Sequence, residues 1–161
     1  VTGRGIRPDQ TRPPGAGGLD WGFAVNEQVL IDFVLEFARS VDGLQRKYAP
    51  ELAEDRQTAS EVFAAYHQEM EALYTRFLTP RKRHCYYFGL SDPPEFHGLE
   101  DGPECVADCN GNRAEITILS AKGGLDYRFN LRCRDGAWRI NSFQQRVRTA
   151  RQTYQWEYGC F

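Results

Sequence analysis

The chain has 161 residues, of which 41% are hydrophobic and 26% charged, and its formal net charge is −2. These values are typical of one globular domain with a sizeable core, and they exclude a general electrostatic attraction to nucleic acid or membranes. No apolar run approaches the roughly 20 residues that span a bilayer, and no signal peptide is visible, so we expect a cytoplasmic protein without a membrane partner. Charge is distributed unevenly, however. Residues 26–80 contain ten acidic and five basic residues, whereas residues 113–161 contain four acidic and nine basic residues.

The first twenty residues are rich in Gly, Pro and Arg and have almost no apolar side chains. Such a composition cannot bury enough apolar surface to fold. We therefore expect residues 1–20 to form a flexible arm and residues 21–161 to form a single domain.

Two amphipathic helices are predicted next. Asn26 is a suitable N-cap for the first helix, whose apolar residues recur every three or four positions from Leu30 to Tyr48 and which we expect to end at Pro50. The sequence Thr58-Ala59-Ser60-Glu61 is a capping box for the second helix, whose apolar face continues to Phe77. Each helix needs another element to bury its apolar face.

The region between the second helix and the sheet combines a short strand with an acidic loop. The aromatic run His84–Phe88 predicts a strand, and residues 91–102 predict a loop with several prolines and acidic residues around one aromatic side chain. We interpret this loop as a candidate protein-binding surface that suits a basic partner, with Phe96 as an exposed anchor. Its proposed contact residues are Asp92, Glu95, Phe96, Glu100 and Asp101.

Three turn signals divide residues 104–148 into an antiparallel meander. Asn-Gly and Asp-Gly are strong two-residue hairpin formers because both central residues of a type I′ turn need positive φ. The turns are Asn110-Gly111, Lys122-Gly123-Gly124 and Asp135-Gly136, and the strands are Glu104–Cys109, Asn112–Ser120, Leu125–Arg134 and Ala137–Arg148.

These turns fix a register in which one face of the sheet is apolar. A change of parity after Ile140 predicts a β-bulge near Asn141-Ser142, which would curve the sheet. The inward positions are Cys105, Ala107, Ala114, Ile116, Ile118, Tyr127, Phe129, Leu131, Cys133, Trp138 and Ile140. We expect both helices to pack on this face, with Phe129 and Trp138 in the core.

The opposite face is expected to be basic. In the predicted register Asp108, Arg113, Arg132 and Arg139 form one row across the four strands, although like charges directly opposite destabilise a sheet. Two interpretations remain open: a solvated surface, or a basic stripe that binds an acidic partner. The residues of this stripe are Arg113, Arg128, Arg132 and Arg139.

The C-terminal tail Thr149–Phe161 contains Tyr154, Trp156, Tyr158 and Phe161. A tail this aromatic is expected either to continue the last strand or to pack between helices and sheet.

Five cysteines are present, and no Cys-x-x-Cys motif occurs. We interpret Cys85, Cys105 and Cys133 as small core residues of a reduced protein. The set His84, Cys85, His97, Cys105 and Cys109 has no structural zinc spacing, so we expect neither a metal nor a cofactor.

This element order resembles the nuclear transport factor 2-like fold, which also includes ketosteroid isomerases. The residues that carry the resemblance are the hairpin from Arg132 to Phe143, with its Gly-x-Trp-x-Ile pattern, and the helix before the sheet. The resemblance implies an α+β fold in which N-terminal helices pack on a strongly curved antiparallel sheet, as a cone-shaped roll. Within that group the chain is most similar to bacterial immunity proteins, which neutralise a cognate toxin.

Two functions remain open at this point. Asp32, His67, Tyr87, Tyr127 and Ser142 are the polar candidates for an enzyme cavity, but the inward face of the meander contains no carboxylate and no histidine. We therefore favour a non-catalytic protein that binds a toxin, as monomer or homodimer, over a small-molecule-binding or isomerase-like enzyme of the same fold. Nucleic-acid binding is third, because the acidic helices and loop would repel phosphates.

Overall fold

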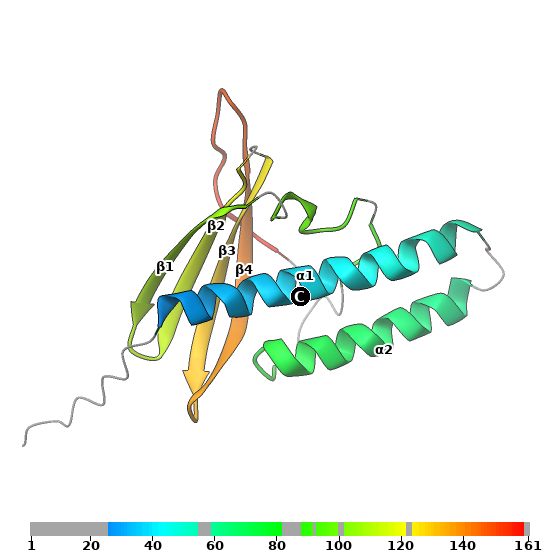
Figure 1. Ribbon diagram of the computed structural model, residues 1–161, viewed down its shortest axis with the longest axis horizontal. Coiled ribbons are helices and arrows are strands. Elements are labelled where there is room, and N and C mark those ends of the chain that lie inside the picture. Colours follow the sequence, from blue (N-terminus) through cyan, green and yellow to red (C-terminus); the bar gives the residue numbers. More distant parts are fainter. Residues whose placement is uncertain are drawn as a thin grey trace, which may run out of the picture.

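Two helices cover one face of a five-stranded antiparallel sheet in this computed structural model, which describes residues 26–54, 59–81, 88–91, 93–99, 102–121 and 124–159 (Figure 1). The helices are α1 (Glu27–Glu54) and α2 (Ala59–Phe77). The strands are β1 (Glu104–Asn110), β2 (Arg113–Leu119), β3 (Gly124–Arg134), β4 (Ala137–Arg148) and β5 (Glu157–Tyr158), and a short 3₁₀ helix spans His97–Leu99. Their order in the sheet is β1-β2-β3-β4-β5, so the sheet is open, with β1 and β5 at its edges. The α+β class is therefore confirmed, and the arm 1–20 lies outside the described residues.

The start of α1 follows the sequence prediction, but its end does not. The Asn26 side chain accepts a hydrogen bond from the Gln28 amide at 3.0 Å, as an N-cap should. The prediction that the helix ends at Pro50 is wrong, because α1 continues to Glu54. Contacts with α2 lie just before Pro50: the Tyr48 hydroxyl donates to Glu69 at 2.6 Å, and Lys47 forms an ion pair with the same carboxylate. The helix therefore continues for four residues beyond Pro50, although proline removes one backbone hydrogen bond.

The β3–β4 hairpin has the predicted turn, register and bulge. Asp135 and Gly136 both have positive φ, as a type I′ turn requires. Leu131 pairs with Ile140, but Asn130 pairs with Ser142, so Asn141 is the extra residue of a β-bulge. The bulge keeps Ile140 and Phe143 on the same buried face of the sheet.

The β1–β2 register differs from the prediction by two residues. Cys105 pairs with Ile118 and Ala107 with Ile116, whereas the predicted turn at Asn110-Gly111 would pair them with Ile116 and Ala114. The turn is Gly111-Asn112 rather than Asn110-Gly111, and among its residues only Gly111 has positive φ. This is the pattern of a type II′ turn, which needs glycine at its first central position. Because a two-residue shift preserves parity, the inward face is unchanged.

The C-terminal segment turns back along β4, instead of continuing it or packing between helices and sheet. Thr153 pairs with Arg148, and β5 pairs with Gln144 and Gln145. Farther along the same edge of β4, the Thr79 amide donates to the Ile140 carbonyl at 2.9 Å. This edge of β4 is thus covered by two segments. Of the predicted strand His84–Phe88, only Phe88 lies within the described residues, and it is not in a strand.

The core fills the space between the helices and the sheet. It includes Phe37, Met70 and Phe77 from the helices, and Phe129 and Phe143 from the sheet. Phe129 is fully buried as predicted, but Trp138 is only partly buried at the rim, because it lies beside the β3–β4 turn.

Candidate functional site

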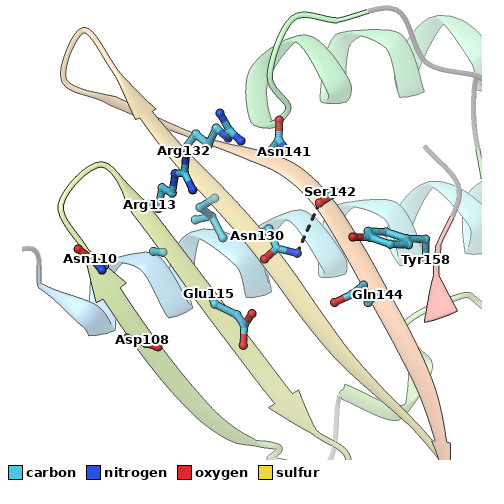
Figure 2. A pocket seen from close by; sticks show the side chains of 12 residues that line it. Asp108, Asn110, Arg113, Glu115, Asn130, Arg132, Asn141, Ser142, Gln144 and Tyr158 are labelled. Carbon is cyan, nitrogen blue, oxygen red and sulfur yellow. Dashed lines mark hydrogen bonds between the residues drawn. The ribbon is translucent and has the colours of Figure 1, made fainter. Parts of the chain in front are cut away.

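The outer face of the sheet, defined here as the face away from the helices, carries a row of three arginines. Arg113 on β2 pairs with Arg132 on β3, and Arg132 pairs with Arg139 on β4. Figure 2 shows the side chains of Arg113 and Arg132 next to each other. We call these three residues the arginine row. It confirms the predicted pairing of Arg113, Arg132 and Arg139, but Asp108 does not belong to it, because Asn110 is the partner of Arg113.

An acidic row crosses the sheet beside the arginine row. Asp108 on β1 pairs with Glu115 on β2, and Glu115 pairs with Asn130 on β3. Asn130 then pairs with Ser142 on β4, and its side-chain amide donates to the Ser142 hydroxyl at 3.4 Å (Figure 2). The displaced β1 register produces this row, because it moves Asp108 from Arg113 to Glu115.

Arg128, the fourth residue of the predicted basic stripe, lies in a different environment. Its guanidinium Nε is 3.2 Å from Glu115, and its Cζ lies 4.3 Å from the centre of the Trp156 ring. Arg146 lies over the same ring at 4.4 Å. Arg128 is thus occupied by contacts within the protein, and the predicted four-residue stripe reduces to the arginine row.

A groove of about 400 Å³ lies over these rows. Both charged rows contribute to its lining, with Arg113 and Arg132 on one side and Asp108 and Glu115 on the other. Tyr158 of β5 lies at the β4 side, where Figure 2 shows it close to Gln144. The groove is therefore polar and contains charges of both signs, which suits recognition of another charged surface.

The C-terminal segment is held in place at three points. The Tyr154 amide donates to the Val147 carbonyl at 2.9 Å, and the Gly159 amide donates to the Phe143 carbonyl at 3.1 Å. A Cβ atom at Gly159 would lie 1.9 Å from the Phe143 ring, so only glycine allows this close approach. Trp156 provides the third contact, because Arg128 and Arg146 lie over its ring. Tyr158 thus remains 76% exposed while its backbone is fixed.

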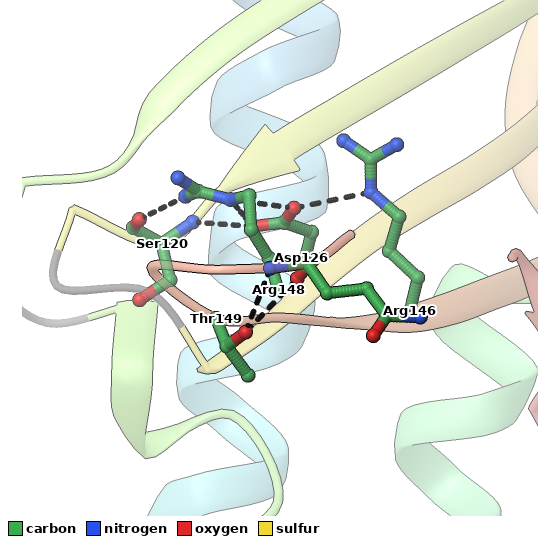
Figure 3. A network of polar contacts seen from close by, with 6 residues as sticks. Ser120, Asp126, Arg146, Arg148 and Thr149 are labelled. Carbon is green, nitrogen blue, oxygen red and sulfur yellow. Dashed lines mark hydrogen bonds and ion pairs between the residues drawn. The ribbon is translucent and has the colours of Figure 1, made fainter. Parts of the chain in front are cut away.

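A buried carboxylate, Asp126, joins three neighbouring parts of the sheet. Asp126 accepts hydrogen bonds from Arg146 Nε at 3.1 Å, Arg148 Nε at 2.9 Å and the Ser120 amide at 3.1 Å (Figure 3). Arg148 also donates to the Ser120 carbonyl. The network joins β3, β4 and the β2–β3 turn. Because protein donors satisfy both carboxylate oxygens of Asp126, we assign the network a structural role.

Phe96 of the acidic loop is not the exposed anchor that we predicted. Phe96 is only 1% exposed, and its ring centre lies 4.9 Å from that of Tyr127 and 5.4 Å from that of Phe88. An anchor for a partner must be accessible, so the prediction for Phe96 is wrong. Glu95 is described and half-buried, whereas Asp92, Glu100 and Asp101 lie outside the described residues.

Polar groups that face the interior hold this loop. The Tyr127 hydroxyl donates to the Glu95 carbonyl at 2.7 Å, and the Tyr66 hydroxyl donates to the Phe88 carbonyl at 2.7 Å. Asp42 and Gln45 on α1 are also buried; Asp42 accepts from the Phe96 amide at 2.7 Å, and Gln45 accepts from the Glu95 amide at 2.6 Å. These groups therefore serve as attachment points for the loop.

Burial shifts the pKa values of several of these groups. It raises the pKa of Tyr66 to about 12 and also raises the pKa of Tyr127, because a phenolate would lose its hydration. Burial likewise raises the pKa of Glu95, although nearby His97 opposes the shift. Both tyrosines are thus kept as neutral hydrogen-bond donors at neutral pH.

The polar residues that we considered for an enzyme cavity do not converge. Asp32 is exposed on α1 and accepts from Gln28, and His67 is exposed on α2. Ser142 lies on the outer face, and Tyr127 points into the core. Tyr87 lies outside the described residues. The described part of the chain therefore brings together no acid–base pair from this set.

Two further observations concern metals and membranes. Within the described ranges no group of three or more His, Cys, Asp or Glu side chains could hold a metal ion. Cys105, Cys109 and Cys133 are free and partly buried, while Cys85 lies outside the described residues. None of the described helices is long and apolar enough to cross a membrane.

Sequence reasoning missed several residues of the groove, among them Glu115, Asn130 and Tyr158. Glu115 and Asn130 occupy outward positions of their strands, so strand parity could have identified them. For Tyr158 the sequence showed only that the C-terminal tail is aromatic. Its position in the groove follows from the pairing of β5 with β4, which depends on tertiary contacts.

No family model, curated protein or solved structure matches this chain.

Proposed function

We propose that the protein acts by binding another protein and has no turnover of its own. The observation that carries the proposal is the position of the Phe96 ring between the helices and the sheet. In a small-molecule enzyme of the resembled fold, the space between helices and sheet would hold the ligand. Here the Phe96 ring occupies that space, and its centre lies 6.0–6.3 Å from the ring centres of Phe37, Phe129 and Phe143.

The outer face supports the same proposal. Its groove contains both basic and acidic side chains, together with an exposed tyrosine on a fixed backbone. Tyrosine and arginine are enriched in the residues that dominate protein–protein binding. Separated charge of this kind speeds association with a complementary partner and disfavours others.

The specific form of the proposal is an immunity protein that neutralises a cognate bacterial toxin, with a nuclear transport factor 2-like roll as its fold. The proposal includes a cytoplasmic location, which the free thiols of Cys105, Cys109 and Cys133 favour. It leaves monomer and homodimer open.

Co-expression with the product of the adjacent reading frame tests this function. We expect the two proteins to co-purify as a complex and the cells to be protected from the neighbouring protein's toxicity. Phe96→Leu serves as a control, because it should alter the core while leaving complex formation intact. Failure to protect and to form a complex, together with conversion of a small molecule by the purified protein, would contradict the proposal and favour the enzyme alternative.

A further inference from the structure

The arginine row is an unfavourable arrangement for the isolated protein. Arg113 faces Arg132, and Arg132 faces Arg139, as direct cross-strand partners. Directly opposed residues in antiparallel strands have Cα atoms about 4.5–5.5 Å apart, and like charges at such positions destabilise a sheet. The sheet therefore gains from any ligand that supplies negative charge at this point.

Three other arginines of the outer face are already paired with the protein's own carboxylates. Arg128 pairs with Glu115, and both Arg146 and Arg148 pair with Asp126. In contrast, no carboxylate among the described residues forms an ion pair with Arg113 or Arg132, and both side chains are exposed. These two guanidinium groups are therefore available to a ligand from outside.

The groove restricts what that ligand can be. Arg113 and Arg132 line it together with Asp108 and Glu115, which lie in the next row of the sheet. A ligand that crosses both rows must present negative charge at the first and a neutral or positive group at the second. A nucleic-acid strand carries a phosphate at every nucleotide, so it would place phosphates against the acidic row.

Tyr158 adds an aromatic wall at the β4 side of the groove. Its backbone is fixed by pairing with Gln144. A tyrosine with a fixed backbone provides contact area at a low cost in conformational entropy. This favours a peptide segment, whose side chains can pack against the ring.

From these observations we infer that the groove binds a segment of the protein partner in which an Asp or Glu side chain contacts Arg113 and Arg132. The arginine fork matches a carboxylate with two parallel hydrogen bonds. Arg139 adds positive charge at the end of the row, although its Nη1 already donates to the Trp138 carbonyl. The inference deepens the proposed function and rests on it.

Binding of defined probes to the intact protein tests the inference. The probes are a short peptide with glutamate at alternate positions, the same peptide with lysine, and a single-stranded oligonucleotide of the same net charge as the glutamate peptide. We expect the glutamate peptide to bind at low ionic strength, with its affinity reduced at least about tenfold by Arg113→Gln combined with Arg132→Gln, a change of about 1.4 kcal/mol. NMR shifts of the arginine Nε–H groups identify which side chains respond.

Arg134→Gln is the matched control. Arg134 is exposed on the same strand as Arg132 but outside the groove lining, so its replacement should leave peptide affinity unchanged. Circular dichroism confirms that each variant is folded. Removing two of the opposed charges should not lower the melting temperature, so a loss of binding cannot be attributed to unfolding.

Three results would overturn the inference: no binding of the glutamate peptide to the unmodified protein, equal losses in the double variant and the control, or tighter arginine-dependent binding of the oligonucleotide. Failure of the proposed function is distinguishable from these. If the glutamate peptide binds as expected but no complex forms in co-expression, the immunity function is contradicted. The inferred carboxylate-binding site is then still supported. A complex that forms equally well with the double variant would contradict the site alone.

Discussion

Asp126 is fully buried although its side chain is a carboxylate. Burying such a group is costly unless it is paired and hydrogen-bonded. Here Arg146, Arg148 and the Ser120 amide all donate to it, so both oxygens have partners. The residue thus connects the β2–β3 turn to the end of β4.

Asp126→Asn should lower the free energy of unfolding by about 3 kcal/mol, because removing one partner of a buried ion pair typically costs about 3–5 kcal/mol and these arginines are partly exposed. Urea unfolding followed by circular dichroism measures the change. Asp135→Asn is the control, since Asp135 is exposed and asparagine tolerates its positive φ of 51°. Equal effects of the two substitutions would show that the network contributes nothing specific.

Glu95 predicts a measurable pH dependence. Burial raises its pKa in the folded protein above that of the unfolded chain, so the folded state holds this proton more tightly. Above its folded pKa, the ionised Glu95 carboxylate destabilises the folded state. This destabilisation disappears as the pH falls through the pKa of Glu95 in the folded protein toward its pKa in the unfolded chain. We expect Glu95→Gln to increase the melting temperature at neutral pH and to have little effect near pH 4. A decrease at neutral pH would contradict this explanation.

At the scale of elements, α1 continues through two residues that disfavour helix, Gly43 and Pro50. The helix persists because Phe37, Val41 and Tyr48 are buried along one face. Gly43 lies on the exposed side, and a Cβ atom there would meet nothing within 4 Å.

Gly43→Ala should therefore raise the free energy of unfolding by roughly 0.5–1 kcal/mol, because alanine loses less backbone entropy in a helix. Chemical unfolding at a fixed pH measures the gain. Gly159→Ala provides the opposite case, since its Cβ atom would overlap the Phe143 ring and should displace the C-terminal segment. If Gly43→Ala destabilised the protein, the continuous helix would be in doubt.

Much of the element pattern could be predicted from sequence, because helical periodicity and turn residues are local signals. The two helices, the β3–β4 turn and the bulge at Asn141 are examples. The β1–β2 turn was misassigned because Asn110-Gly111 and Gly111-Asn112 are both good two-residue turns. Both turns also place the same side chains on the inward face of the sheet, so the apolar pattern does not distinguish them. The arginine row followed from register, whereas the burial of Phe96 and the position of Tyr158 depend on tertiary contacts that have no local signal.

At the scale of the whole molecule, the loop that contains Phe96 closes the interior. Its backbone is bonded to α1 through Asp42 and Gln45 and to β3 through Tyr127. The ring then contacts aromatic side chains from helix and sheet. Phe96 therefore belongs to the core rather than to a binding surface.

Phe96→Ala should lower the free energy of unfolding by about 3–5 kcal/mol, as for other large aromatic truncations in cores. Thermal and urea unfolding measure the loss. Phe63→Ala on the exposed side of α2 is the control and should cost much less. A mild effect at Phe96, combined with loss of partner binding, would support the surface role that the structure contradicts.

The order of the elements along the chain has a consequence for synthesis on the ribosome. The helices are made first, and residues 55–136 separate α1 from β4, which supplies Ile140 and Phe143 to the core. At about 10 residues per second, roughly 8 s pass between the two. During that time the apolar faces of the helices lack their final cover, so we expect chaperones to bind the nascent chain until the last long strand emerges.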